Sequence, residues 1–163
     1  MPARRLASEI VEVLSHRGLT ITTMESCTGG ALVNAITDVP GASAVLHSAY
    51  ITYSNSAKVA RGVPHRVIHD HTVYSLETAQ AMAQAAIKEA RADVAVGITG
   101  SLNRVDPANK ERSEPGTVYV AVFLSTGKGL RREIRLEPSQ PREASKKMIV
   151  EESIRMVLEL LDG

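Results

Sequence analysis

The chain has 163 residues, a length at which one domain can bury a core without disulfides or metals. Its 19 Lys and Arg residues nearly balance 18 Asp and Glu residues, and the net charge of +1 provides no strong field for binding nucleic acid or an anionic membrane. Aromatic residues make up only 3%, and a lone cysteine excludes both an internal disulfide and a thiolate metal cluster.

A helix followed by a strand is predicted at the start of the chain. Apolar residues at helical spacing predict a helix over residues 3–17, and the β-branched run Leu19–Met24 predicts a buried strand. The stretch Glu25–Gly30 then leads into a second helix over residues 31–36. No signal-type apolar run starts the chain, and no segment approaches the ~20 apolar residues of a membrane span. We expect a cytoplasmic protein.

The next segment contains a strand and a short helix. Val45–Tyr53 has the apolar and β-favouring composition of a strand. Ser54 or Asn55 then provides a cap for a short helix, because side chains of these types accept hydrogen bonds from first-turn amides. Gly62-Val63-Pro64 ends that helix.

The middle of the chain predicts a helix, a strand and a long loop. Ser75 and Thr78 are alternative N-caps for an Ala-rich helix that ends near Arg91. Val94–Thr99 is uniformly apolar, as in a strand covered on both faces. Leu102–Pro115 is polar and irregular, and its length favours a functional loop.

The C-terminal part predicts a hairpin and a long helix. Val118–Leu124 and Leu130–Leu136 flank a glycine-containing turn, and Arg142–Leu161 has a helical pattern. Helices alternating with strands, followed by a hairpin, predict an α/β fold with a mixed sheet sandwiched by helices in three layers, α/β/α. With no repeat or linker, residues 1–163 are expected to form one domain.

The junction between the first strand and the second helix has two interpretations. Amide groups at a helix N-terminus, glycines at positions 29 and 30, and the hydroxyls of Ser26 and Thr28 together favour an anion site at a strand's carboxyl end. The alternative is a plain strand-to-helix turn that Thr28 caps. The glycine spacing matches neither the dinucleotide fingerprint nor the phosphate-binding loop.

Lys58 is the second candidate, just beyond the predicted second strand. A lysine that is desolvated loses proton affinity and then serves as a base for a serine such as Ser26. Taken alone, it is more simply an exposed lysine on a short helix. Cys27 is a candidate nucleophile, but a small residue buried beneath the turn is the simpler interpretation.

The histidines do not form a metal-binding motif. Four of the five lie between residues 47 and 71, yet we recognise no helix that carries a His-x-x-x-His pair beside a carboxylate. We expect no metal and no cofactor.

Six short motifs occur in a fixed order: Glu25-Ser-Cys-Thr-Gly-Gly30, Val39-Pro-Gly41, Tyr53-Ser-Asn-Ser-Ala-Lys58, Gly62-Val-Pro64, His71 with Ser75, and Gly116-Thr-Val118. Together they resemble the C-terminal domain family of CinA, the nicotinamide-nucleotide amidases. The resemblance runs from residue 5 to residue 160. Since the separate N-terminal domain of full-length CinA proteins is not in this sequence, the chain resembles the stand-alone form.

The resemblance implies hydrolysis of nicotinamide mononucleotide, a small nucleotide, to nicotinic acid mononucleotide and ammonia. The family's serine–lysine pair matches Ser26 and Lys58, with the lysine as base and the serine as nucleophile. Self-association into a homo-oligomer is common in the family. We expect these residues to bind the substrate: Thr28, Gly29, Gly30, Tyr53, Asn55, Thr99, Gly100, Arg104 and Arg142. Arg142 matches an arginine that opens the family's last helix; it is either a bidentate phosphate clamp or an exposed first-turn residue.

The chain departs from the family in two places. Where the family has a Gly-Pro-x-Gly-Gly run, this chain has Asn103-Arg104-Val105-Asp106-Pro107, and Gln140-Pro141 replaces a Gly-Asp pair. Arg104 either points inward and binds a phosphate or carboxylate, or lies on the surface. Three hypotheses therefore stay open: an amidase for nicotinamide mononucleotide, an amidase for another small carboxamide, and a nucleotide-binding or regulatory protein without turnover.

Overall fold

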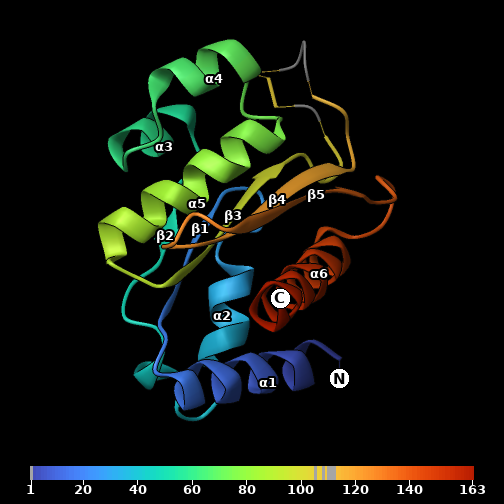
Figure 1. The fold of residues 1–163 in the computed structure, drawn as a ribbon. Helices are drawn as coiled ribbons and strands as arrows, with labels where there is room; N and C mark the ends of the chain where they lie inside the picture. Colours follow the sequence, from blue (N-terminus) through green and yellow to red (C-terminus); the bar gives the residue numbers. More distant parts are fainter. Residues whose placement is uncertain (1, 105, 108, 110–112) are drawn as a thin grey trace.

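A five-stranded mixed sheet lies at the centre of the molecule, in the order β2-β1-β3-β4-β5 (Figure 1). The computed structural model describes residues 2–104, 106, 107, 109 and 113–163. The strands are β1 (Ile21–Glu25), β2 (Tyr50–Ile51), β3 (Val94–Gly100), β4 (Thr117–Leu124) and β5 (Gly129–Arg135). The first three run parallel, whereas β4 and β5 pair antiparallel. The predicted mixed sheet is confirmed, and β1, β2 and β3 end at the same edge.

Helices cover both faces of this sheet, as Figure 1 shows. They are α1 (Pro2–Arg17), α2 (Ala31–Thr37), the 3₁₀ helix η1 (Ala42–Ala44), α3 (Asn55–Ala60), α4 (His65–His71), α5 (Leu76–Ala90) and α6 (Arg142–Asp162). α3, α4 and α5 lie on one side, and α1, α2 and α6 on the other. The expected three-layer arrangement is therefore confirmed. In the described part of the chain, no helix combines the length and apolar character needed to cross a membrane.

The α5 face is packed closely because its residues are small. Ser75 caps α5 by accepting a hydrogen bond from the Thr78 amide at 3.1 Å. Alanines of α5 lie directly against β3, where a Cβ added at Gly97 would come within 2.1 Å of the Ala79 carbonyl oxygen. The Ala-rich sequence and Gly97 thus let helix and strand approach more closely than larger side chains allow.

The opposite face holds the larger core. Aliphatic side chains of α1, α2 and α6 pack with the other face of β1, β3 and β4 in one cluster. Ile10 and Leu14 of α1 and Ile154 of α6 are fully buried. Burying each of these side chains stabilises the folded state by on the order of 2 kcal/mol. This layer therefore accounts for much of the stability.

The second strand is shorter than predicted. The expected span Val45–Tyr53 contains only β2, two residues long at the sheet edge. The preceding part still follows β1 through separate bonds, from the Ile21 amide to the Val45 carbonyl at 2.8 Å and from the Thr22 hydroxyl to the Ser48 carbonyl at 2.8 Å. Strand-like composition marked the contact with β1, but an irregular backbone at the edge prevents a continuous ladder.

Helix α4 was not predicted. It has no buried residue, so its sequence has no apolar periodicity to reveal it. It places His65 and His69 one turn apart, and His69 Nδ1 lies 3.0 Å from Asp70 Oδ1. The expectation of no helical His-x-x-x-His pair was wrong in this respect. Among the described residues, however, no three His, Cys, Asp or Glu side chains gather as a metal site requires.

Candidate active site

The turn from β1 into α2 is organised by the buried carboxylate of Glu25. Its Oε1 accepts the Thr28 hydroxyl at 2.7 Å and the Leu32 amide at 2.9 Å, while Oε2 accepts the Val33 amide at 3.0 Å and the Thr23 hydroxyl at 3.3 Å. Two first-turn amides of α2 are thereby occupied by a protein carboxylate. The Glu25 carboxylate therefore caps the helix N-terminus, and the amides of Leu32 and Val33 are not available to an anion.

A cavity lies above Ser26, and three residues that were expected to bind substrate do not line it: Thr28, Gly29 and Gly30. Thr28 directs its hydroxyl to Glu25. The two glycines have positive φ angles of 60° and 99°, and a Cβ at Gly30 would lie 2.9 Å from the Ile51 side chain. Backbone conformation and packing, rather than ligand approach, thus require glycine here.

Ser26 is the first residue of this turn and is held at the end of the parallel sheet. Its amide donates to the Ile98 carbonyl of β3 at 3.0 Å, and its hydroxyl lies 3.3 Å from the Tyr53 carbonyl oxygen. The residue is largely buried. Its hydroxyl therefore has a fixed position beside the chain segment that follows β2.

Lys58 reaches this hydroxyl from helix α3. Ser54 caps α3 by accepting the Ala57 amide at 3.1 Å, and Lys58 lies one turn later with a side chain only 1% exposed. Its Nζ lies 3.0 Å from Ser26 Oγ and 2.8 Å from the Thr52 carbonyl oxygen. The sequence places these two side chains 32 residues apart, and the fold brings them into hydrogen-bond contact.

Burial changes the proton affinity of this amine. Desolvation lowers the pKa of Lys58 to about 8, even though the Asp106 charge favours the protonated form. A neutral amine has two N–H bonds, which suit the carbonyls of Thr52 and Tyr53 at 2.8 and 3.4 Å. Its lone pair then faces Ser26 Oγ, the arrangement that a general base requires.

Cys27 is a poorer candidate for the nucleophile than Ser26. Burial raises the pKa of its thiol to about 12, with only partial opposition from the nearby Lys58 charge. The reactive thiolate is therefore negligible at neutral pH. The interpretation of Cys27 as a small buried residue agrees with its 5% exposure.

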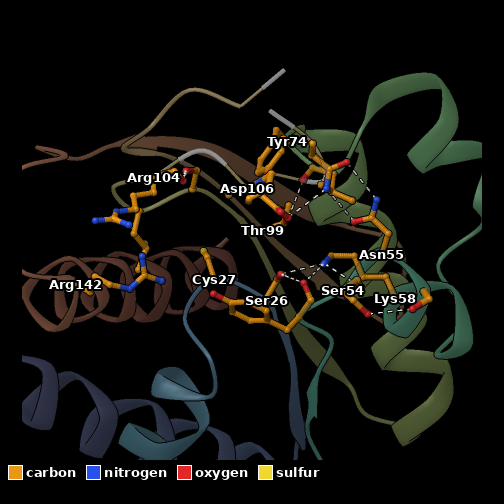
Figure 2. A pocket seen from close by; sticks show the side chains of 18 residues that line it. Ser26, Cys27, Ser54, Asn55, Lys58, Tyr74, Thr99, Arg104, Asp106 and Arg142 are labelled. Atoms are coloured by element: carbon orange, nitrogen blue, oxygen red, sulfur yellow. Dashed lines mark hydrogen bonds between the residues drawn. The ribbon is translucent and has the colours of Figure 1, made fainter. Parts of the chain in front are cut away.

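A cavity of about 800 Å³ opens above the Ser26–Lys58 pair. Eight of the eleven residues selected from the sequence line it: Ser26, Tyr53, Asn55, Lys58, Thr99, Gly100, Arg104 and Arg142. Figure 2 shows the two arginines at one end and Ser26 with Lys58 at the other, with Cys27 between them. Thr99 directs its hydroxyl to the Val73 carbonyl at 2.7 Å and contributes mainly to the shape of the wall.

Arg142, the first residue of α6, contacts the loop that departs from the family pattern. Its Nη1 donates to Asn103 Oδ1 at 2.7 Å. Arg104 also lines the cavity, and its carbonyl accepts the Ser101 hydroxyl. Val105, within the same departing run, lies outside the described residues.

Several lining residues were not among those selected from the sequence: Ser54, Ser56, Val73, Tyr74, Ser101, Leu102, Asp106, Pro107 and Asn109. Most come from the 101–115 loop or from the segment before α5, which have no periodic pattern. Asn109 has a specific partner, since its side-chain amide and that of Asn55 exchange hydrogen bonds at 3.4 Å. The polar composition of this loop was the available signal, but it did not identify individual residues.

The sequence and the fold of this chain are similar to those of known proteins. The CinA C-terminal domain description matches residues 3–161. The nicotinamide-nucleotide amidohydrolase PncC of Escherichia coli strain K12 is 38% identical over 129 residues, which cover 78% of this chain and 77% of that protein. A CinA-like protein of Chloroherpeton thalassium is 39% identical over 128 residues, 77% of this chain.

The chain spans only 28–30% of the length of this CinA-like protein and two similar relatives from Caldicellulosiruptor species. Among solved structures, the competence/damage inducible protein CihA from Agrobacterium tumefaciens superposes with a TM-score of 0.89 at 29% identity, covering 98% of this chain and 96% of that one. Because the family description and this structural likeness both extend over nearly all residues, the chain belongs to the CinA C-terminal domain family.

Proposed function

We propose that this protein hydrolyses nicotinamide mononucleotide to nicotinic acid mononucleotide and ammonia. The observation that carries the proposal is the 3.0 Å contact between Lys58 Nζ and Ser26 Oγ at the floor of a polar cavity. The relative named nicotinamide-nucleotide amidohydrolase supports the choice of substrate.

In the first half-reaction, neutral Lys58 takes the proton of the Ser26 hydroxyl as Oγ attacks the carboxamide carbon. The carbonyl electrons move to oxygen, giving a tetrahedral oxyanion. Collapse of this intermediate breaks the C–N bond, and the lysine ammonium returns the proton to the leaving nitrogen, which departs as ammonia. Water then attacks the acyl-serine with Lys58 again as base, releasing the carboxylic acid and the Ser26 hydroxyl.

The oxyanion needs hydrogen-bond donors close to Ser26. The amide of Gly29 donates to the Ser26 carbonyl at 3.0 Å, and those of Leu32 and Val33 donate to Glu25. We therefore assign the oxyanion to the amide of Cys27, which directly follows the nucleophile and lines the cavity.

The phosphate is assigned to the opposite end of the cavity. Arg104 and Arg142 lie there, and guanidinium groups bind phosphate through charge-assisted, often bidentate, hydrogen bonds. A nucleotide that extends along the cavity thus places its phosphate at the arginines and its carboxamide at Ser26.

The test is incubation of the purified protein with nicotinamide mononucleotide, with both ammonia and nicotinic acid mononucleotide quantified by chromatography. Stoichiometric release of both, abolished in Ser26→Ala, is the expected result. Binding without turnover in the wild type would instead favour the nucleotide-binding alternative. Turnover of nicotinamide riboside at an equal or higher kcat/KM would favour an amidase for another small carboxamide. A cytoplasmic location, a single domain and self-association remain predictions; light scattering after gel filtration tests the last.

A further inference from the structure

The charges around the cavity are unevenly distributed. Lys58 lies at one end, and Arg104 and Arg142 lie at the other. Among the described residues that line the cavity, Asp106 is the one carboxylate. Figure 2 shows it near Thr99 and Tyr74, on the side of the cavity above Ser26 rather than beside the arginines' side chains.

Asp106 is connected to the helix that carries the lysine. The Asn109 amide donates to the Asp106 carbonyl at 2.9 Å, and the Asn109 side chain lies 3.4 Å from Asp106 Oδ2. Asn109 in turn pairs with Asn55, the first residue of α3. The carboxylate is thus positioned relative to Lys58, which lies one turn further along the same helix.

Its charge reaches the groups around the reacting atoms. Burial lowers the pKa of Lys58, and Asp106 acts in the opposite direction by favouring the ammonium form. Burial also raises the pKa of Tyr74, and Asp106 adds to that increase by disfavouring the phenolate. The Asp106 carboxylate therefore contributes an attraction for a positive charge on a ligand bound in this cavity, opposite in sign to the contributions of Lys58 and the two arginines.

The proposed substrate carries such a charge. Its ring nitrogen bonds to ribose, which makes the oxidised ring a pyridinium cation, whereas the reduced 1,4-dihydro form is neutral with the same carboxamide, ribose and phosphate. We propose that Asp106 selects the cationic pyridinium ring over its neutral reduced counterpart. This inference rests on the proposed function. It adds a residue that distinguishes the charge of the ring, whereas the two arginines bind the phosphate.

Another role for Asp106 predicts a different pattern. If it served only to hold the loop through Asn109, or only to adjust the protonation of Lys58, its removal would change turnover of oxidised and reduced substrates by the same factor. The change in the ratio of the two kcat/KM values between the wild type and a variant cancels these shared contributions and the different intrinsic reactivities of the two carboxamides, and it isolates the interaction of residue 106 with ring charge.

The experiment compares kcat/KM for oxidised and reduced nicotinamide mononucleotide at pH 8, with products separated by chromatography. We expect the wild type to prefer the oxidised form. Asp106→Asn should lower the ratio of the two kcat/KM values about tenfold, as loss of one nearby charge in a partly solvated site implies, and Asp106→Glu should retain most of the wild-type ratio. Glu114→Gln is the matched control. The substitution removes a negative charge from the same loop, but Glu114 pairs with Arg135 and does not line the cavity.

Equal losses for both substrates in Asp106→Asn would overturn the proposal. A second measurement separates this result from a failure of the proposed function: Kd values for the two forms are measured by calorimetry with Ser26→Ala and with Ser26→Ala combined with Asp106→Asn. If the wild type hydrolyses neither form, the amidase assignment fails, and the Kd ratio still decides whether Asp106 reads ring charge. Indistinguishable Kd values in Ser26→Ala, or no binding of either form, would overturn the inference.

Discussion

The two walls of the cavity are built in different ways. The β1–α2 turn that carries Ser26 is held by buried bonds, four to the Glu25 carboxylate and one from the Ser26 amide to β3. The described residues of the facing 101–115 loop contact other elements through polar side chains, Asn103 with Arg142 and Asn109 with Asn55. We therefore expect the chemistry, which needs a fixed nucleophile, on the buried wall, and ligand selection on the loop wall.

The largest expected effect comes from removing the pair on the buried wall. Ser26→Ala, Lys58→Ala and the double variant should each lose ~10²-fold or more in kcat, because residues acting as one unit give non-additive losses. Steady-state kinetics with nicotinamide mononucleotide measure this. Multiplied losses in the double variant would show that the two side chains act independently. EDTA should leave the wild-type rate unchanged.

The next effect concerns the support of that wall. Glu25→Gln replaces one carboxylate oxygen by an N–H₂ group that faces hydrogen-bond donors, including the Val33 amide at 3.0 Å or the Leu32 amide at 2.9 Å. We expect the free energy of unfolding to fall by about 2 kcal/mol, the cost of an unsatisfied buried donor, and kcat to fall with it. Urea titration measures the stability. Glu9→Gln on the exposed side of α1 is the control, and equal stabilities of both variants would contradict the role of Glu25.

The pH dependence tests the base on the same wall. Because burial lowers the pKa of Lys58 to about 8, the neutral fraction rises from roughly a tenth at pH 7 to nine tenths at pH 9. The rate should therefore increase almost tenfold across this range. The increase should disappear from the residual activity of Lys58→Ala. A wild-type rate that is constant from pH 6 to 9 would exclude Lys58 as the base.

The smallest expected effect lies on the loop. Arg104→Ala should weaken binding of nicotinamide mononucleotide by about 1 kcal/mol, the loss of one charge-assisted hydrogen bond, and should change binding of the dephosphorylated riboside much less. Calorimetry with Ser26→Ala provides both Kd values. Arg155→Ala removes an exposed arginine of α6 outside the cavity and serves as the control. Equal losses for the two ligands would show that Arg104 does not read the phosphate.

Much of the fold followed from local patterns. The helices at both ends, the Ala-rich α5 and the β4–β5 hairpin were predicted to within a few residues, because each has a strong periodicity or a glycine-containing turn. Helix α4 was missed because none of its residues is buried. The second strand was overextended because its composition reports contact with β1 and not the backbone geometry at a sheet edge.

The sequence by itself determined the layers, the order of elements and, through the resemblance of six motifs, the candidate pair Ser26 and Lys58. Only the tertiary structure decided what the amides after Ser26 contact. Glu25 was placed in the stretch after the first predicted strand, yet it ends β1 and its carboxylate caps α2 by accepting hydrogen bonds from the Leu32 and Val33 amides. The same holds for Asp106 and Asn109, whose places in the cavity depend on α3 across the site. Periodicity encodes which face of an element is buried, whereas a polar side chain's partner depends on elements distant in sequence, whose separation no local pattern records.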